Sequence, residues 1–503
     1  MKDTYLKRII SAKVYDVAQQ TDLERAQGLS ERLGNNIFLK REDQQPIFCY
    51  KIRGAYNKMR KLTAAQLAKG VVTASAGNHA QGVALSAKKL GCEAIIVMPT
   101  TTPEIKQRAV KSFGAEVVLI GDSYSDASVH AAALVKEQQK TYIPPFDDPD
   151  VIAGQGTVAA EIWRQHSGAI DAVFIPIGGG GLAAGMSAYF KALNPEIKII
   201  GVEPIDSNAM GLSIAAGKRI ELEEVGIFAD GVAVKKVGEE TFKLCKEYLD
   251  EVITISTDEM CAAIKDIFED TRSIVEPSGA LGVAGIKKWL KANPGEGQNL
   301  VTVLTGANLN FDRLRHVAER TAIGEGNEKL IAVTIPEEAG SFQTLFRTLG
   351  DLSVTEFNYR YGDEKQASIF VGFNCADPEI VKERLGLLAN KGFKPVDLTD
   401  NSLAKLHGRY LVGGRAHELT DERIFSFQFP ERRGALLDYL EQISGRWNIS
   451  LFHYRNHGSD FGRVLCGMQV PKETEKQFDE FLTKLGYTYS EQTDNAFNEL
   501  FLS

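Results

Sequence analysis

Lys51 is the residue whose setting most strongly indicates chemistry. It follows the apolar and aromatic run "IFCY", Ile47 to Tyr50, and precedes Ile52. A lysine that loses the hydration of its ammonium group has a lowered pKa, and its neutral amine is a nucleophile. Such an amine could form a Schiff base with an aldehyde cofactor. A lysine at a helix start that extends its charged end to solvent is the alternative, and this segment alone leaves both open.

A turn of small and polar residues in "TASAGNHAQG" could bind an anion. The pattern predicts a strand that ends near Ser75, a turn through Ala76 and Gly77, and a helix that leaves from Asn78. We call these four residues the small-residue turn. Amide N–H groups exposed at such a helix start bind anions, including a carboxylate. The alternative is an ordinary strand-to-helix turn that Ser75 or Asn78 caps.

A run of four glycines in "FIPIGGGGLAAG" could bind a phosphate. This glycine loop, Gly178 to Gly181, follows a predicted strand and precedes a predicted helix. Glycines let the backbone wrap closely around a phosphate, so that its N–H groups contact the oxygens. The loop therefore predicts a phosphate-containing ligand.

The glycine loop also fits a relaxed dinucleotide-binding fingerprint. Gly178, Gly180 and Ala183 occupy its three small positions, and Glu203 ends the next predicted strand, where an acid that binds ribose is expected. A nicotinamide-dependent oxidoreductase is therefore an alternative function. It leaves the lysine and the small-residue turn without a role.

Strands and helices alternate around these segments. From about Val71 to Glu203, buried strands such as "AIIVMP" and "IKIIGVEP" are separated by amphipathic segments such as "GNHAQGVALSAKKLG". Strand-helix alternation predicts an α/β fold with a mostly parallel sheet that helices cover on both faces.

The C-terminal third contains an internal repeat. "AVTIPEEAGSFQTLF" resembles "SFQFPERRGALLDYL", and "VTEFNYRYGD" resembles "ISLFHYRNHG". Three pairs of equivalent residues recur 94 or 95 positions apart: Pro336 and Pro430, Gly340 and Gly434, and Tyr359 and Tyr454. Each copy predicts a strand, a Pro-Gly turn, a helix, a strand, a hairpin and a strand. The repeat therefore predicts two small α+β modules behind a larger domain.

Composition excludes several classes of protein. The 503 residues carry a net charge of -8, which argues against a nucleic-acid-binding surface. No apolar run approaches a membrane-spanning length, and the N-terminus interrupts its apolar residues with charges, unlike a signal peptide. Six scattered cysteines without a CxxC pair fit free thiols in a reducing cytoplasm. We expect a cytoplasmic protein without a metal, because His453 and His457 lie on a predicted strand and turn where their spacing does not converge.

The segments "YKIRGA", "SAGNHAQG" and "GGGGL" together resemble the signature set of pyridoxal-phosphate enzymes of the tryptophan-synthase-β fold type. Within that group the chain resembles the threonine dehydratases of the biosynthetic, allosteric form over almost its whole length, and its repeats resemble their two ACT-like regulatory domains. The resemblance implies a fold type II catalytic domain of two parallel-sheet subdomains over residues 1–321. A linker over 322–329 and ACT-like domains over 330–401 and 423–494 would follow.

The resemblance also implies a role for each candidate residue. Lys51 would form the Schiff base with pyridoxal 5'-phosphate and then take the proton from the substrate Cα. Asn78 would bond the cofactor's ring hydroxyl, the small-residue turn would hold the substrate carboxylate, and Thr305 in "LTGAN" would bond the ring nitrogen. The phosphate would bind the backbone of Gly178, Gly179, Gly180, Gly181 and Leu182.

Three positions depart from related sequences. Cys49 stands where the family commonly has serine or alanine, and Thr305 stands where it usually has serine. Both changes are small, and threonine keeps the hydroxyl. Related serine racemases carry a second serine, which acts as a base, at the position of Ala76. The alanine therefore argues against racemisation.

The resemblance implies deamination of L-threonine to 2-oxobutanoate and ammonia, the entry step toward isoleucine. It also implies a homotetramer that isoleucine inhibits, with valine opposing this inhibition. Tyr359 and Tyr454 are the first candidates for effector contact, and plain packing is the alternative role for each. An L-serine dehydratase of the same fold is the nearest alternative function. A nicotinamide-dependent oxidoreductase and a non-catalytic amino-acid sensor are alternatives from other classes.

Overall fold

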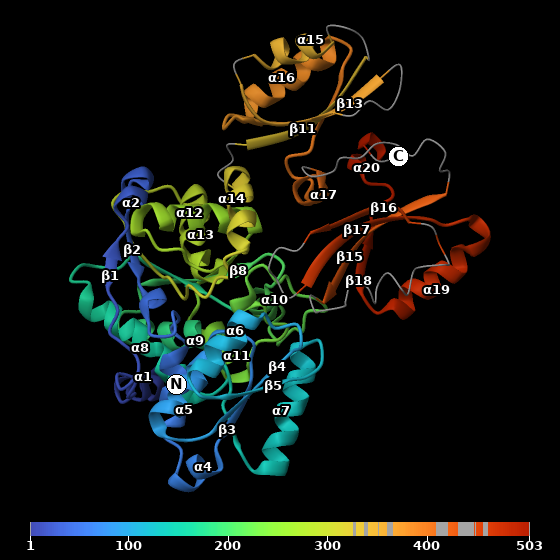
Figure 1. Cartoon of the computed structure of the whole chain (residues 1–503). Helices are drawn as coiled ribbons and strands as arrows, with labels where there is room; N and C mark the ends of the chain where they lie inside the picture. The colour runs from blue at the N-terminus through green and yellow to red at the C-terminus, as the bar shows by residue number, and fades with distance from the viewer. Residues whose placement is uncertain are drawn as a thin grey trace. The chain divides into compact units, whose positions relative to one another are not determined.

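The computed structural model describes residues 2–324, 328–336, 341–350, 352–359, 366–408, 421–430, 447, 449–455 and 461–501. The chain divides into two compact units, Met1–Ala318 and Glu319–Ser503, which we call the N-terminal and the C-terminal unit (Figure 1). All three candidate segments belong to the N-terminal unit.

A six-stranded sheet forms the centre of the N-terminal unit. Its strands lie in the order β1-β2-β10-β7-β8-β9, and all neighbours pair in parallel except β1 and β2. β10, the last of these strands in the sequence, therefore lies between β2 and β7 in the sheet. The strands are β1 (Leu23–Arg25), β2 (Asn36–Lys40), β7 (Ala172–Pro176), β8 (Lys198–Pro204), β9 (Glu251–Ile255) and β10 (Asn299–Val303).

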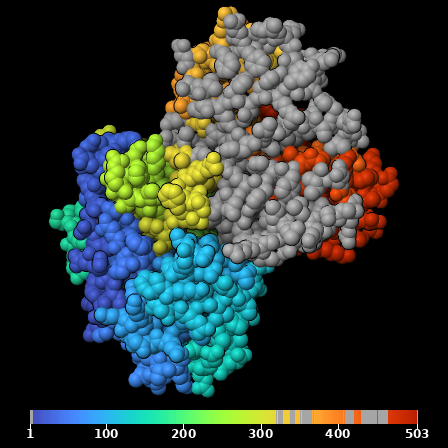
Figure 2. Space-filling model, viewed as in Figure 1, coloured from blue at the N-terminus to red at the C-terminus, as the bar shows by residue number. Residues whose placement is uncertain are grey.

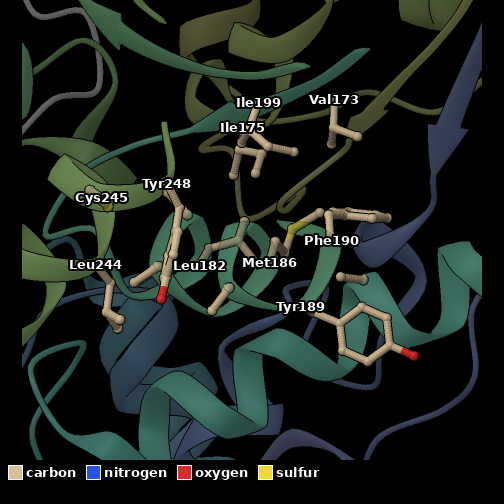
Figure 3. Packing of buried hydrophobic residues seen from close by; sticks show 14 of the residues in the cluster. Val173, Ile175, Leu182, Met186, Tyr189, Phe190, Ile199, Leu244, Cys245 and Tyr248 are labelled. Atoms are coloured by element: carbon tan, nitrogen blue, oxygen red, sulfur yellow. The ribbon is translucent and has the colours of Figure 1, made fainter. Parts of the chain in front are cut away.

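Helices cover both faces of this sheet. Along β7, Val173 and Ile175 belong to one hydrophobic core, whereas Ala172 and Phe174 belong to another. This alternation is the period of two that a strand with two buried faces requires. Figure 3 shows Val173 and Ile175 on the side that faces α9. The covering helices include α8 (Pro149–Gln165), α9 (Gly181–Leu193), α11 (Glu239–Tyr248), α12 (Thr257–Thr271) and α13 (Pro277–Ala292).

A smaller, fully parallel sheet in the same unit has the order β5-β4-β3-β6. Val71 and Ile96 face one core, while Val72 and Ile95 face another. The predicted α/β fold with two parallel-sheet subdomains is confirmed. The strands are β3 (Val71–Ala74), β4 (Ala94–Met98), β5 (Glu116–Leu119) and β6 (Thr141–Tyr142), and the helices include α5 (Asn78–Leu90), α6 (Glu104–Ser112) and α7 (Tyr124–Gln138).

Residues far apart in the sequence meet at the surface of the N-terminal unit. The N–H groups of Gly28 and Leu29, at the start of α2 (Gln27–Leu33), donate to the carboxylate of Asp270 at 2.8 and 2.9 Å. Figure 2 shows the blue N-terminal surface bordering the yellow-green surface of the later helices. An acidic side chain at a helix N-terminus is stabilising, so this contact ties the beginning of the chain to α12.

Glycines bring three helices of the N-terminal unit into backbone contact. A Cβ on Gly154 of α8 would lie 2.6 Å from the carbonyl oxygen of Arg53 in α3 (Lys51–Met59), and a Cβ on Gly185 of α9 would lie 2.4 Å from the carbonyl oxygen of Ile152 in α8. Because the opposing atoms are backbone atoms, no side-chain rotation could relieve either contact. This glycine seam therefore sets how closely α3 and α9 approach α8. It consists of Gly54, Gly154, Gly156 and Gly185.

Two antiparallel sheets of equal strand order form the C-terminal unit. Their orders are β12-β13-β11-β14 and β16-β17-β15-β18. The predicted pair of α+β modules is confirmed. The strands are β11 (Glu328–Pro336), β12 (Ser353–Tyr359), β13 (Gln366–Asn374), β14 (Lys394–Asp397), β15 (Glu422–Pro430), β16 (Ile449–Arg455), β17 (Phe461–Gln469) and β18 (Thr488–Glu491).

Each copy of the repeat continues beyond the predicted elements, with a further helix and a fourth strand. The first copy continues through α16 (Pro378–Asn390) into β14, and the second through α19 (Glu475–Leu485) into β18. The hydroxyl of Thr399 accepts from the N–H of Leu330 at 3.2 Å, and that of Thr493 accepts from the N–H of Ile424 at 3.1 Å. The two bonds are equivalent, because Thr399 and Thr493 are 94 positions apart, as are Leu330 and Ile424. The helix predicted in the first copy is α15 (Ser341–Leu349), and Gly340 before it lies outside the described ranges. In the second copy residues 431–446, which include Gly434, lie outside the described ranges.

The segment 322–329, expected to link the larger domain to the first module, belongs to the C-terminal unit and has regular structure at both ends. Helix α14 (Arg313–Gly324) extends into it, and β11 begins at Glu328. Residues 325–327 lie outside the described part of the chain. Helical backbone therefore occupies its first three residues.

None of the helices within the described ranges combines the length and the apolar character needed to cross a membrane. In the same ranges no three His, Cys, Asp or Glu side chains are grouped where they could hold a metal ion. His453 belongs to β16, and His457 lies outside the described residues.

Candidate active site

Lys51 is the first residue of α3 and is partly buried. Its Nζ donates a hydrogen bond to the carbonyl oxygen of Pro145 at 3.1 Å. Burial lowers the pKa of this ammonium group, while Cys49 and Glu276 oppose the shift. At a given pH more of this amine is neutral than in an exposed lysine, so the setting favours a nucleophile over a solvated charge.

Residues 143–146 connect the three candidate segments. They supply the carbonyl group that binds the lysine. Phe146 packs so closely on the glycine loop that a Cβ on Gly179 would lie 2.2 Å from its ring. The carbonyl oxygen of Ile143 is 2.9 Å from Nε2 of His79, which lies in the first turn of α5 beside the small-residue turn. The lysine, the glycine loop and the turn therefore share one scaffold.

His79 is a neutral imidazole in this scaffold. Burial lowers its pKa to about 3, and the charge of Lys51 adds to that shift. Because Nε2 faces a carbonyl oxygen, which can only accept, we infer that the proton lies on Nε2. Nδ1 is buried without a hydrogen-bond partner among the described residues. At neutral pH His79 therefore adds no positive charge beside the lysine.

The glycine loop presents an open helix N-terminus. It lies between β7 and α9, and Gly180 has a φ of +95°, which only glycine adopts readily. No side chain caps α9, and its first turn contains no acid. The unoccupied N–H groups and the helix dipole favour an anion there. Leu182 points its side chain into the core (Figure 3), so only its backbone can face such a ligand.

The small-residue turn lies between β3 and α5, and its four residues are partly buried. The hydroxyl of Ser75 accepts from the N–H of Gly77 at 3.3 Å, but no side chain caps α5 itself. The start of α5 therefore has free donors for a carboxylate, which an ordinary capped turn would have occupied. Ala76 brings no hydroxyl to this turn.

Thr305 lies directly beside the lysine segment. It follows β10 and is only 4% exposed. Its carbonyl oxygen accepts from the N–H of Tyr50 at 3.3 Å, and Cys49 pairs with Gly306 in an isolated antiparallel bridge. The end of a central strand is thus joined to the residue before Lys51.

Glu276 and Asn308 hold the side chain of Asn78. Its Nδ2 donates to Oε1 of Glu276 at 2.7 Å, and its Oδ1 accepts from Nδ2 of Asn308 at 2.6 Å. The segment "VEPSGALG" predicts a helix start at Pro277 whose residues could also line the pocket, and Glu276 is the N-cap residue of this helix, α13. No local pattern pointed to its contact with a residue 198 positions away.

An ionic network without solvent contact anchors α3 just after the lysine. Arg53 donates to Glu42 at 2.7 Å and to Glu161 at 2.6 Å, and Lys40 lies 2.7 Å from Glu161. All four side chains are fully buried. The two carboxylates come from either side of α3 in the sequence, so the guanidinium fixes the start of this helix to the short helix η1 (Glu42–Gln44) and to α8.

Glu203 does not serve as the acid of a dinucleotide site. It lies one residue before the end of β8, but its carboxylate accepts from the N–H groups of Met210 and Gly211 at 2.9 and 2.8 Å, at the start of α10 (Ala209–Ala216). It has no solvent exposure, and burial raises its pKa to about 7. The alternative of a nicotinamide-dependent oxidoreductase therefore lacks the ribose-binding group on which it depended.

The two tyrosines considered for effector contact lie on equivalent strands. The backbone of Tyr359 pairs with Ile369 in β12 and β13, and that of Tyr454 pairs with Val464 in β16 and β17. Their side chains lie outside the described part of the structure. Effector contact by either residue stays a prediction.

Comparison with known proteins assigns families to both parts of the chain. The profile of the family described as "Pyridoxal-phosphate dependent enzyme" matches residues 14–306. The profile described as "C-terminal regulatory domain of Threonine dehydratase" matches residues 319–407 and 413–502.

Individual relatives extend over the whole chain. The biosynthetic L-threonine dehydratase of Burkholderia multivorans is 56% identical over 99% of both chains, and that of Escherichia coli is 51% identical over 99% of this chain and 97% of its own. The solved structure of the processed form of threonine deaminase isoform 2 from Solanum lycopersicum is 49% identical and has a TM-score of 0.63, covering 64% of this chain and 88% of that one. The chain therefore belongs to the biosynthetic threonine dehydratases, pyridoxal-phosphate-dependent lyases with a C-terminal regulatory domain.

Proposed function

We propose that this chain converts L-threonine to 2-oxobutanoate and ammonia in the cytoplasm, as the first step toward isoleucine. The observation that carries the proposal is the amine of Lys51, held by the Pro145 carbonyl on the same short segment that packs against the glycine loop. A nucleophilic amine and an anion site on one scaffold suit an aldehyde cofactor that carries a phosphate. The family profile over residues 14–306 supports the same cofactor.

The residues present fit pyridoxal phosphate. The uncapped N-terminus of α9, with glycine at every position of its loop, leaves backbone donors free for the phosphate, and we assign the N–H groups from Gly178 to Leu182 to it. We assign Asn78 to the ring hydroxyl and Thr305 to the ring nitrogen. When bound, the cofactor supplies an aldehyde and an electron-withdrawing ring that stabilises negative charge at the substrate Cα.

The protein's own groups position the substrate and move its protons. The small-residue turn binds the carboxylate through the free N–H groups of α5, which places Cα near Lys51. The neutral amine of Lys51 takes the Cα proton, and the ammonium so formed can return this proton to the β-hydroxyl, which leaves as water. Because Ala76 has no hydroxyl, no second base acts from that position, and elimination is favoured over racemisation.

A direct assay tests this function. The purified protein, supplied with pyridoxal phosphate, should release 2-oxobutanoate from L-threonine and show a visible absorbance that borohydride removes. L-serine should also react, because one methyl group in a pocket changes kcat/KM by a factor equivalent to only about 1–3 kcal/mol. A higher kcat/KM for serine would make the chain a serine dehydratase, and a colourless, inactive protein would contradict the proposal.

We propose that the two modules, residues 330–401 and 423–494, bind isoleucine and valine and that the enzyme acts as a homotetramer. The profile of the regulatory domain supports amino-acid effectors in this part of the chain. Isoleucine need only prefer an arrangement of low activity, with a coupling free energy of about 1–3 kcal/mol. By linkage, threonine must weaken isoleucine binding by the same factor.

Truncation should separate catalysis from regulation. The full chain should give sigmoidal threonine saturation curves that isoleucine shifts to higher concentration by about 5- to 150-fold, and valine should oppose the shift. A chain that ends at Gly324 should lose the response to isoleucine, since it retains the compact N-terminal unit and the end of α14 but neither sheet of the C-terminal unit. Initial rates over a range of threonine concentrations give the measurement. Hyperbolic curves without any isoleucine response in the full chain would leave the modules an assembly role.

A further inference from the structure

Glu276 has an unusual position for an acid at the start of a helix. It is the N-cap residue of α13, yet its side chain caps no backbone N–H of that helix. Within α13 its Oε1 accepts only from the hydroxyl of Ser278, at 2.6 Å. The carboxyl is instead turned inward, and the residue is only 3% exposed. An N-cap acid normally accepts from the N–H groups of its own helix. Here that interaction is given up for contacts within the candidate site.

Glycines and backbone bonds make room for this carboxyl. A Cβ on Gly306, the residue after Thr305, would lie 2.9 Å from Oε1 of Glu276, and one on Gly231 would lie 3.1 Å from it. The N–H of Glu276 donates to the carbonyl oxygen of Gly306 at 3.1 Å. Glu276 is therefore fitted between the segment that carries Thr305 and the short helix η2 (Asp230–Val232).

The orientation of the Asn78 amide follows from its partners. Nδ2 of Asn308 donates to the carbonyl oxygen of Ile47 at 2.9 Å, and a carbonyl can only accept, so this atom is a nitrogen. The Asn78 atom that bonds to it must then be the oxygen. The Asn78 nitrogen consequently faces Glu276 and uses one of its two hydrogens there. Its second hydrogen stays available for the site.

We propose that Glu276 is a positioning residue for the reaction: with Asn308 it holds the Asn78 amide so that the remaining N–H is directed at the ring hydroxyl of pyridoxal phosphate. This inference rests on the proposed function of the site. A group that fixes the orientation of a ligand-binding side chain contributes to ligand affinity although it does not touch the ligand.

Several charged groups surround Glu276, and they provide a competing explanation. Burial and then Asp230 raise the pKa of its carboxyl, while the hydrogen bonds from Ser278 and Asn78 and then the charge of Lys106 lower it. The charge of Glu276 in turn raises the pKa of Lys51. The same charge also raises the pKa of the Cys49 thiol and of the Tyr50 phenol. Glu276 could thus act by charge on Lys51 rather than by its bond to Asn78. A test must separate the effect of the hydrogen bond to Asn78, which depends on the length of the side chain, from the effect of the charge.

Two conservative variants make this separation. Glu276→Gln keeps an acceptor oxygen at the same reach but removes the charge. Glu276→Asp keeps the charge but is one methylene shorter, which withdraws the oxygen from Asn78. Positioning predicts that Glu276→Asp weakens binding of pyridoxal phosphate to the apoenzyme by roughly 10- to 100-fold, the range for a hydrogen bond to a charged group, and changes the ratio of visible to near-ultraviolet absorbance. Glu276→Gln should stay close to wild type in both measurements.

A double-mutant cycle and a control complete the experiment. In an Asn78→Ala background, Glu276→Asp should lower cofactor affinity by less than about twofold, because the side chain through which it acts is gone. Asp266→Asn, a buried acid on α12 that pairs with Lys287, should leave cofactor affinity and absorbance unchanged even if it lowers the melting temperature. The inference is overturned if Glu276→Gln loses as much affinity as Glu276→Asp, or if the loss persists without Asn78. Wild-type binding and turnover, measured in parallel, report separately on the proposed function.

Discussion

Lys51→Ala is expected to lower kcat for 2-oxobutanoate formation by at least about 10³-fold, because the variant loses both the nucleophile and the base of the proposed reaction. It should also lose the visible absorbance that borohydride removes from the wild-type enzyme. The fold should persist, since the Lys51 amine makes a single hydrogen bond, to the Pro145 carbonyl, and takes no part in the ionic network of Arg53. Steady-state kinetics, absorbance spectra and a thermal melt measure the three outcomes.

Lys58 provides a matched control on the same helix. It lies 2.7 Å from Asp148 in an ion pair and has no place in the proposed chemistry. Lys58→Ala should therefore keep its turnover and its spectrum. If folded Lys51→Ala still released 2-oxobutanoate at a rate near that of wild type, the assignment of the catalytic lysine would be wrong.

Arg53→Leu is expected to destabilise the N-terminal unit by about 3–5 kcal/mol. The substitution leaves the buried carboxylates of Glu42 and Glu161 without their shared guanidinium, and an unpaired buried charge is strongly unfavourable. Because the chain has two compact units, the relevant quantity is the unfolding transition of the N-terminal unit in denaturant rather than one global value.

The effect of Arg53→Leu should depend on pH. Burial alone would raise the pKa of Glu161, but Arg53 and then Lys40 more than offset it and hold the pKa below its usual value. The stabilisation from this pairing is therefore present above the ordinary pKa of a glutamate and is lost as the pH falls through the lowered value. The deficit of the variant should be largest at neutral pH and shrink on acidification.

A surface pair gives the control for the Arg53 experiment. Lys243 and Glu239 form an exposed pair one turn apart on α11, so Lys243→Leu should leave the transition nearly unchanged at every pH. A deficit for Arg53→Leu no larger than that of Lys243→Leu would show that the buried network does not stabilise this unit.

The sequence revealed those parts of the site whose chemistry is local. The glycine loop and the small-residue turn each lie between a strand and the helix that follows it, so their anion-binding character can be read from a few adjacent residues. The lysine was recognisable because its immediate neighbours are apolar. Their meeting in one site came from the resemblance to a family, since periodicity alone does not place one turn beside another.

The parts that sequence reasoning missed depend on contacts between distant residues. Glu276 and Asn78 are 198 positions apart, and Arg53 and Glu161 are 108 apart. A glutamate before Pro277 has the same local pattern whether it caps its helix or turns inward. The space that lets it turn inward is provided by Gly306 and Gly231, which no local rule connects to it.

The fold of the C-terminal unit was predictable where its two copies still resemble each other. Pro336 and Pro430 and the tyrosines of the paired strands revealed the first half of each module. The second helix and fourth strand were missed, although the letters "TDN" recur 94 positions apart, at Thr399 and Thr493. That short match was a usable signal, because the structure gives both threonines the same backbone partner within their copies.

The glycine seam has a consequence for how this enzyme can change over generations. Every single-base change in a glycine codon that alters the amino acid adds at least a Cβ, and at Gly154 and Gly185 that atom would overlap backbone at 2.6 and 2.4 Å. Even the smallest amino-acid substitution at these two codons would therefore disturb the packing of the helices. We expect lineages that change substrate preference to do so through the loops that surround Lys51, while the distance between the lysine and the glycine loop is inherited unaltered.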